Sequence, residues 1–253
     1  MTGTKSKVDH AALRREFPAT ANAIYMDVAN QGLTSKTTIA SIGKHLENRL
    51  QGLNDEEEML EHVEITRARF AEFIGAAGDE ISITKNASEG INIIANAISW
   101  KPGDNVVLCP KLEHANNILP WLQVNTHHDV EIRVVEPEDG VLPPDAVVKA
   151  INSRTRVVAA ATVTMVPGFR TVMQPISEAC RRAGAFLLAD GTQSVGILHT
   201  DVRELGLDGL AVSTVKGLMG LYGSGFLYCR REWADRLNPA YLARFSVDLG
   251  NAP

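Results

Sequence analysis

The sequence is poor in the residues and patterns that mark several large classes of protein. Its three cysteines, Cys109, Cys180 and Cys229, are too few and too far apart for a disulfide framework or a cysteine-based zinc site. No apolar run approaches the roughly 20 residues that span a bilayer, and residues 1–17 are polar rather than signal-like. We therefore predict a cytoplasmic protein with no membrane partner, in which the cysteines serve as buried apolar residues.

Charge and short motifs exclude further classes. The 25 Lys and Arg residues against 30 Asp and Glu give a net charge of -5, and the basic residues are scattered, so nucleic acid is not an expected partner. The patterns G-x-G-x-x-G, G-x-x-x-x-G-K-[ST] and H-E-x-x-H are all absent from the sequence. It thus lacks the fingerprints of nicotinamide-binding proteins, P-loop proteins and zinc proteases, and we predict no metal site.

The composition that remains is typical of a globular protein, with 45% hydrophobic and 22% charged residues. Short apolar or β-branched runs predict seven strands, at 81–84, 105–109, 130–135, 156–163, 185–190, 210–213 and 225–229. Helical patterns lie before or between them, at about 36–52, 55–75, 88–98, 114–124, 143–153 and 173–184. This alternation predicts an α/β fold with a mostly parallel seven-stranded sheet and helices on both faces.

No internal repeat and no linker rich in Pro, Gly or Ser divides the chain. We predict an N-terminal helical segment, residues 1–75, followed by one continuous large domain, residues 76–253. The acidic run DEEEMLEHVE, residues 55–64, is expected to be the solvated face of a helix.

Two strands are expected to deliver charged residues to one edge of the sheet. Asp190 ends the apolar run LLAD, and Lys216 follows the next run, LAVS. With a crossover helix between these strands, both side chains would reach one cleft. A buried lysine has a lowered pKa and can form a Schiff base with an aldehyde. Pyridoxal phosphate is an aldehyde whose ring nitrogen also needs a carboxylate partner. Taken singly, Asp190 could instead cap a turn and Lys216 could be a surface lysine.

Two further segments support a cofactor site. In TKNASEGINIIANAI, residues 84–98, a helix expected to begin at Ser88 offers free N–H groups to a phosphate. In LEHANNILPW, residues 112–121, His114 could stack on an aromatic ring, although a lone histidine is more often an ordinary surface or packing residue.

In this order the segments NASEGIN, EHANNILPW, LLADGTQSVG and STVKGLMGLYGSGFLY resemble the class V aminotransferases. These are fold-type I pyridoxal-phosphate enzymes that include cysteine desulfurases, selenocysteine lyases and isopenicillin N epimerase-like proteins. The resemblance implies a Schiff base at Lys216, a pyridine-nitrogen contact from Asp190, and ring stacking with proton transfer by His114. It also implies that Gln193 contacts the phenolic oxygen, that Asn30 lies on the substrate side, and that the phosphate is bound by Ala87, Ser88 and Ser213.

The sequence also departs from the family pattern. Met165 stands where the family has an asparagine near the cofactor oxygen, and Val215 replaces a phosphate-binding histidine. The resemblance covers the N-terminal segment and the large domain, and the pattern of the small C-terminal domain is not found before Pro253. The substrate-binding arginine and the desulfurase cysteine of the family belong to that missing part.

The first functional hypothesis is therefore a class V aminotransferase-like enzyme that uses pyridoxal phosphate and acts on an amino acid as its small-molecule substrate. A cysteine desulfurase or lyase activity is one alternative. A second alternative is a shortened or degenerate chain that acts as a partner subunit or is a fragment. A third alternative is an ordinary nucleotide-binding domain, which shares the fold class. The family resemblance implies a homodimer, or a partner that supplies the small domain.

Overall fold

The computed structural model describes residues 8–53, 55–239 and 241–243. The first residues of the predicted N-terminal segment, and the end of the predicted large domain up to Pro253, lie outside the described residues. All seven predicted strands are present, and each bound lies within two residues of the expected one. They are β1 Ile81–Thr84, β2 Asn105–Leu108, β3 Glu131–Val134, β4 Thr155–Ala161, β5 Phe186–Asp190, β6 Gly209–Ser213 and β7 Gly225–Cys229.

The strands form a single sheet in the order β1-β7-β6-β5-β4-β2-β3. The four pairs between β3, β2, β4, β5 and β6 are parallel, whereas β7 runs antiparallel to both of its neighbours, β6 and β1. The predicted mostly parallel seven-stranded sheet is confirmed. Because β4, β5 and β6 point the same way, their carboxyl ends meet at one edge.

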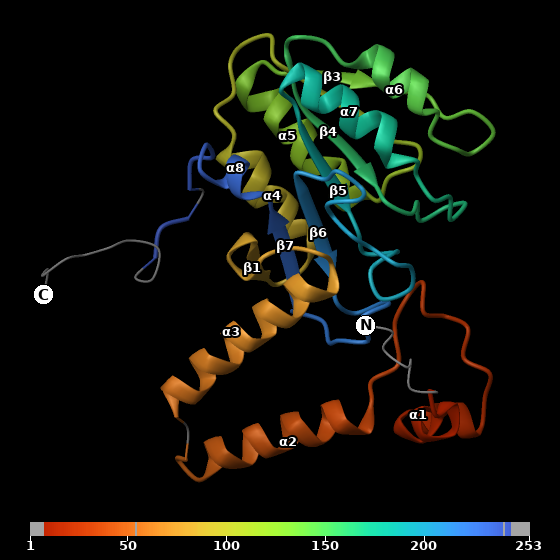
Figure 1. Ribbon diagram of the computed structural model, residues 1–253, viewed down its shortest axis with the longest axis vertical. Coiled ribbons are helices and arrows are strands. Elements are labelled where there is room, and N and C mark those ends of the chain that lie inside the picture. The colour runs from red at the N-terminus through yellow and green to blue at the C-terminus, as the bar shows by residue number, and fades with distance from the viewer. Residues whose placement is uncertain (1–7, 54, 240, 244–253) are drawn as a thin grey trace, which may run out of the picture.

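Helices cover both faces of the sheet, as predicted (Figure 1). Side chains alternate along each strand, so Phe186 and Leu188 face one layer while Leu187 and Ala189 face the other. The first layer contains α4 Ala87–Ala97, α5 Leu119–His128 and α8 Arg231–Ala234, and the second contains α3 Glu56–Phe73, α6 Pro144–Ala150 and α7 Met173–Ala183. The two apolar layers hold the sheet edge in a fixed position.

Local structure differs from the predictions at several points. The link from β5 to β6, residues 191–208, consists of turns and contains no helix, so the predicted crossover helix is wrong. Helix α5 begins at Leu119 rather than at residue 114, because Pro120 favours the first turn of a helix and a 3-10 turn, Ala115–Asn117, precedes it. The short helix α1, His10–Glu16, was not predicted.

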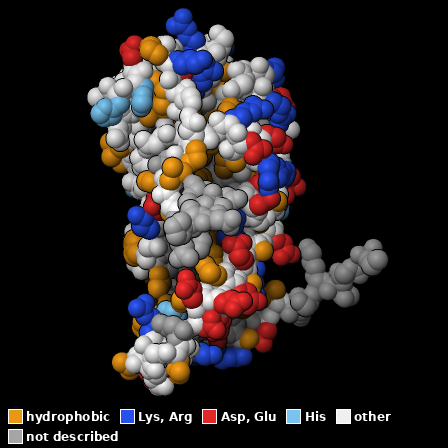
Figure 2. All heavy atoms as spheres, turned by 90° about the vertical axis from the view of Figure 1, so that its left-hand side faces the viewer, with side chains coloured by type: hydrophobic (Ala, Val, Ile, Leu, Met, Phe, Trp, Pro, Cys, Tyr) orange, Lys and Arg blue, Asp and Glu red, His pale blue; other side chains and the backbone are white. Residues whose placement is uncertain are grey.

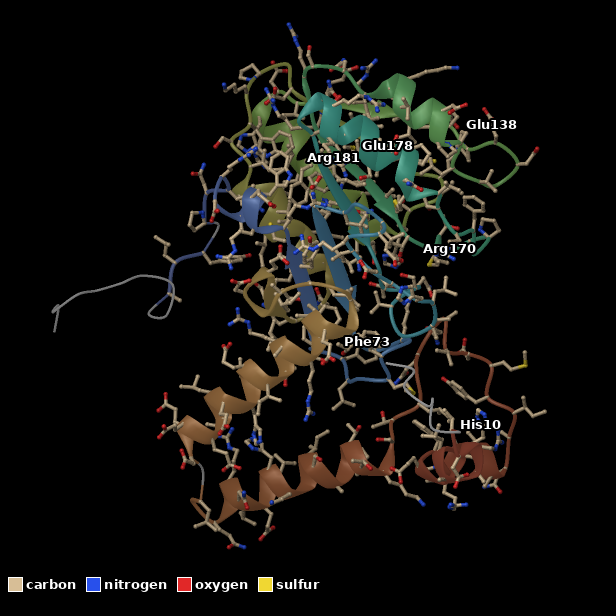
Figure 3. All side chains as sticks on the ribbon, viewed as in Figure 1. His10, Phe73, Glu138, Arg170, Glu178 and Arg181 are labelled. Atoms are coloured by element: carbon tan, nitrogen blue, oxygen red, sulfur yellow. The ribbon has the colours of Figure 1, made fainter. Side chains whose placement is uncertain are left out.

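Helix α2, Lys36–Leu50, and most of α3 form an arm that extends from the sheet (Figure 1). Phe73, in the last turn of α3, lies where the arm joins the body, whereas Glu178 and Arg181 lie on α7 in the upper part of the molecule (Figure 3). Every residue of the acidic run 55–64 is exposed, which confirms the predicted solvated helix face. Acidic side chains accordingly gather in the lower half of the molecule (Figure 2). Within the described residues, none of the helices has the length and apolar character that crossing a bilayer requires.

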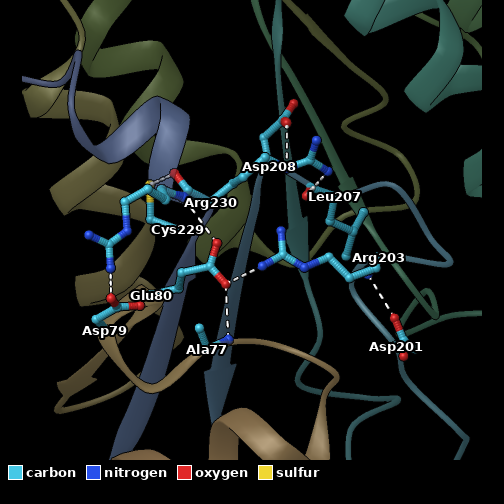
Figure 4. Close-up of polar contacts among 10 residues, drawn as sticks. Ala77, Asp79, Glu80, Asp201, Arg203, Leu207, Asp208, Cys229 and Arg230 are labelled. Carbon is cyan, nitrogen blue, oxygen red and sulfur yellow. Dashed lines mark hydrogen bonds and ion pairs between the residues drawn. The ribbon is translucent and has the colours of Figure 1, made fainter.

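A buried carboxylate, Glu80, ties the end of this arm to the sheet (Figure 4). It accepts hydrogen bonds from the backbone N–H groups of Ala77 and Arg231, each 3.0 Å long, and it pairs with the guanidinium of Arg203. Burial alone would raise the pKa of Glu80, but these donors outweigh burial and hold the pKa below the ordinary value of 4.5.

We expect Arg203→Ala to lower the free energy of unfolding by about 1–3 kcal/mol at neutral pH, the range for losing a hydrogen bond to a buried charged group. Because the pKa of Glu80 is lowered in the folded state, its stabilising contribution is complete above pH 4.5 and is lost as the pH falls through the folded pKa. The gap between wild type and variant should therefore narrow in acid. Urea denaturation at pH 7 and pH 4 measures this, with the exposed Arg182→Ala as a control expected to stay within about 0.5 kcal/mol. An equal gap at both pH values would contradict the role given to Glu80.

Candidate active site

A cavity of about 570 Å³ opens at the carboxyl edge of the sheet. It lies at the last residues of three parallel strands, Ala161 of β4, Asp190 of β5 and Ser213 of β6, and at the start of α4. All of the predicted site residues line it, namely Asn30, Ala87, Ser88, His114, Asp190, Gln193, Ser213 and Lys216. Its volume falls within the range of ligand sites, about 300–1,000 Å³.

Lys216 projects from a turn that is packed against other backbone segments. A Cβ on Gly217 would lie 2.5 Å from the Val195 carbonyl oxygen, and one on Gly32 would lie 2.3 Å from the Lys216 carbonyl oxygen. Gly32 also donates a 2.7 Å hydrogen bond from its N–H to the Val215 carbonyl. Only glycine permits such close approach at these two positions, so the N-terminal segment and the β5–β6 link fix the backbone that carries the lysine.

The two central groups, Lys216 and Asp190, lie within electrostatic reach of each other. Partial burial lowers the pKa of the Lys216 amine, and the carboxylate of Asp190 raises it in part. Asp190 is 8% exposed, and its Oδ1 accepts a 2.9 Å hydrogen bond from the N–H of Thr192. An amine of lowered pKa and a fixed carboxylate therefore share one cavity.

One end of the cavity is formed by the N-terminus of α4. The helix begins at Ala87 rather than Ser88, because the side chain of Asn86 caps it by accepting a 2.9 Å hydrogen bond from Glu89 N–H. The N–H of Ala87 donates to Ser213 Oγ at 2.9 Å, which leaves the Ser213 hydroxyl proton free to donate into the cavity. Free N–H groups and hydroxyls at a helix N-terminus suit an anion such as phosphate.

The remaining predicted residues lie on the cavity wall. His114 is exposed, and its Nδ1 accepts a 3.2 Å hydrogen bond from the N–H of Asn116, which orients the ring. Gln193 donates from Nε2 to the Ala29 carbonyl at 3.2 Å and so links the N-terminal segment to the site. Asn30 donates to Asp27 Oδ2 at 3.1 Å. Their chemical roles stay predictions.

Several lining residues were missed by the sequence analysis. Lys85, whose ammonium lies 3.2 Å from Glu89 Oε1, belongs to the turn that was already singled out before α4. Thr192 lies two residues after Asp190, and Tyr222 lies in the glycine-rich segment after Lys216. The side chains that depart from the family pattern, Met165 and Val215, also line the cavity.

The residues present fit pyridoxal phosphate in three respects. An amine of lowered pKa, a buried carboxylate and a helix N-terminus with hydroxyl donors line one cavity of suitable size. The fit is weaker at Val215 and Met165, where apolar side chains offer no hydrogen bonds. Elsewhere in the described part of the chain, no group of three or more His, Cys, Asp and Glu side chains comes together to hold a metal ion.

This fold and this site define the large domain of a fold-type I pyridoxal-phosphate enzyme. The family model of class V aminotransferases matches residues 24–248. The chain belongs to the class V aminotransferase family, a family of pyridoxal-phosphate-dependent enzymes.

Curated relatives and solved structures agree with this assignment. A probable cysteine desulfurase of Methanothermobacter thermautotrophicus is 34% identical over 93% of this chain, and an uncharacterized aminotransferase of Bacillus subtilis is 29% identical over 94%. The apo structure of a cysteine desulfurase from Thermococcus onnurineus superposes with a TM-score of 0.85 at 30% identity and covers 95% of the chain. The chain spans only 60%, 63% and 62% of these three proteins, respectively.

Proposed function

We propose that this chain forms the cofactor-binding part of a pyridoxal-phosphate enzyme that acts on the α-carbon of an amino acid. The observation that carries the proposal is the presence of Lys216 and Asp190 in one cavity beside the N-terminus of α4. When bound, pyridoxal phosphate supplies an electron sink for the electron pair released at that α-carbon. The remaining chemistry falls to side chains of this chain.

Each side chain has a task that its surroundings support. The lowered pKa of Lys216 makes its amine a nucleophile for the cofactor aldehyde and a base for a substrate proton. Asp190, whose Oδ1 accepts the hydrogen bond from Thr192 N–H, would be the partner of a protonated ring nitrogen. Ala87, Ser88 and Ser213 would hold the phosphate, His114 would cover a face of the ring, Gln193 would contact the phenolic oxygen, and Asn30 would lie on the substrate side.

The type of reaction is less narrowly supported. Transamination needs no thiol, whereas a desulfurase needs a thiol that accepts sulfur. Burial raises the pKa of Cys180 and of Cys229 to about 12, and it also raises the pKa of Cys109, so none of the three is a ready nucleophile. None of them lines the cavity. The names of the probable cysteine desulfurases among the relatives favour cysteine as a substrate and make desulfuration or β-elimination the second candidate activity.

We further propose that the chain works in the cytoplasm and as a homodimer. The division into an N-terminal segment, 1–75, and a large domain, 76–253, also stays a prediction.

Titration of the purified protein with pyridoxal phosphate tests the proposal. We expect a yellow complex whose visible band disappears on borohydride reduction and leaves the modification on the peptide containing Lys216. Incubation with cysteine in the presence of a thiol reductant, and separately with alanine, then separates the reactions. Alanine and sulfide formed from cysteine indicate desulfuration, and pyruvate formed from cysteine together with ammonia and sulfide indicates β-elimination. Pyruvate formed from alanine without release of ammonia indicates transamination. A colourless protein that takes up no cofactor would support the alternative of a degenerate partner subunit.

A further inference from the structure

Glu113, next to His114 in the sequence, is a buried carboxyl that the proposed chemistry does not use. Its side chain lies behind the cavity wall, and the residue is 9% exposed. Its Oε1 accepts a 2.7 Å hydrogen bond from the N–H of Ala161, and its Oε2 accepts a 2.8 Å hydrogen bond from Asn117 Nδ2. One carboxylate therefore bridges the strand β4 and the 3-10 turn that follows His114.

The bridge reaches the centre of the site. Ala161 is the last residue of β4, lines the cavity, and lies opposite Asp190 in the register of β4 and β5. Holding the N–H of Ala161 fixes the distance between the segment that carries His114 and the strand end that carries Asp190. Glu113 is thus placed to set the position of His114 relative to Asp190, the two residues predicted to contact the cofactor ring.

The hydrogen-bond directions require an acceptor at both oxygens of residue 113. Trp121 Nε1 donates to Asn117 Oδ1 at 3.4 Å, so the amide of Asn117 is oriented with its nitrogen toward Glu113. Both Trp121 and Asn117 are fully buried, so their polar groups need partners within the protein. In a glutamine at this position, the N–H₂ group would face one of the two donors and could not accept its hydrogen bond. Only a carboxylate accepts the hydrogen bonds of both donors.

Retaining a carboxylate here has an energetic cost. The pKa of Glu113 is raised to about 7, mainly by burial and to a smaller extent by the nearby carboxylate of Asp190, although the hydrogen bonds from Asn117 and Ala161 lower it in part. A neutral apolar residue at this position would avoid that cost, so the carboxylate is not explained by packing alone.

We propose that Glu113 is a positioning residue of the cofactor site, which holds the His114 turn against β4 so that His114 and Asp190 flank one bound ring. The proposal rests on the proposed function. It assigns Glu113 no contact with the cofactor, because Glu113 acts through the backbone of Ala161 and through Asn117.

Glu113→Gln tests this with matched shape and one lost hydrogen bond. We expect the folded variant to bind pyridoxal phosphate more weakly, by up to about tenfold, because binding must then order the His114 turn that this hydrogen bond already holds in the wild type. We also expect the circular dichroism induced in the cofactor band, per bound cofactor, to change, because that signal reports how the ring sits between its neighbours. Glu136→Gln is the matched control. It removes an exposed carboxylate that pairs with Lys111, which lies two residues before Glu113 in the sequence.

The possible results distinguish a failure of the proposed function from a failure of the role proposed for Glu113. If the wild type takes up no cofactor, the proposed function and this proposal both fail before any variant is made. If the wild type binds and Glu113→Gln loses only thermal stability, with affinity and induced dichroism unchanged, Glu113 is a structural residue and only this proposal is overturned. If Glu113→Gln does not fold, Glu113→Asp carries the test, because its shorter side chain keeps the charge but cannot reach both donors. Wild-type affinity and dichroism in Glu113→Asp would overturn the proposal.

Discussion

Lys216→Ala is expected to abolish the borohydride-stable attachment of pyridoxal phosphate to the chain completely. The lowered pKa of the Lys216 amine leaves a larger neutral fraction than an ordinary lysine has. Lys216 is half-buried, whereas the other lysine that lines the cavity, Lys85, is exposed. Any turnover should fall by a factor on the order of 10⁴ or more, because the residue that both links the cofactor and moves the proton is gone. Intact-mass measurement after reduction checks the attachment.

Lys85→Ala is the matched control for this change. Lys85 lines the same cavity, but its side chain is 74% exposed and its ammonium is paired with Glu89. Reduction of Lys85→Ala should still place the modification at Lys216. An adduct that persists in Lys216→Ala, or one that is found at Lys85 in the wild type, would remove Lys216 from its assigned role.

The strands and the outline of the site could be predicted from the sequence. The inner strands are buried on both sides, so they appear as continuous apolar runs such as FLLAD, which are hard to confuse with loops. Residues that follow such runs must collect at one sheet edge when the strands are parallel. That rule brought Asp190, Ser213 and Lys216 together correctly, although it assumed a crossover helix that the chain does not form.

The remainder depends on contacts between distant segments. The antiparallel direction of β7 is set by its pairing with β6 and β1, for which the run GFLYC carries no signal. Asn86 caps α4 because its side chain accepts a hydrogen bond from the N–H of Glu89, whereas the sequence led us to expect the helix to begin at Ser88. Glu113 and Gly32 could not be singled out, since the importance of each arises from a partner in another segment, Ala161 and Lys216.

Asp190→Asn is expected to leave the fold and the attachment at Lys216 intact while lowering turnover by about 10²–10³-fold, the usual effect of removing one preorganised electrostatic contact. The asparagine Oδ1 can still accept the hydrogen bond from Thr192 N–H, so the backbone turn after β5 is preserved. What is lost is the negative charge that keeps a ring nitrogen protonated. Steady-state kinetics measures the loss, with whichever of cysteine and alanine proves to be a substrate in the incubation experiment.

Asp190→Asn should also change the pKa of Lys216. Asp190 raises the pKa of Lys216 against the larger lowering by burial, so its removal should lower that pKa further. The pH midpoint for the rate of adduct formation should therefore move downward in Asp190→Asn, as measured by stopped-flow mixing with pyridoxal phosphate. Asp27→Asn is the control, because Asp27 lines the cavity but is exposed and does not contribute to the pKa of Lys216. A midpoint that moves equally in both variants, or upward in Asp190→Asn, would contradict the placement of Asp190 beside the lysine.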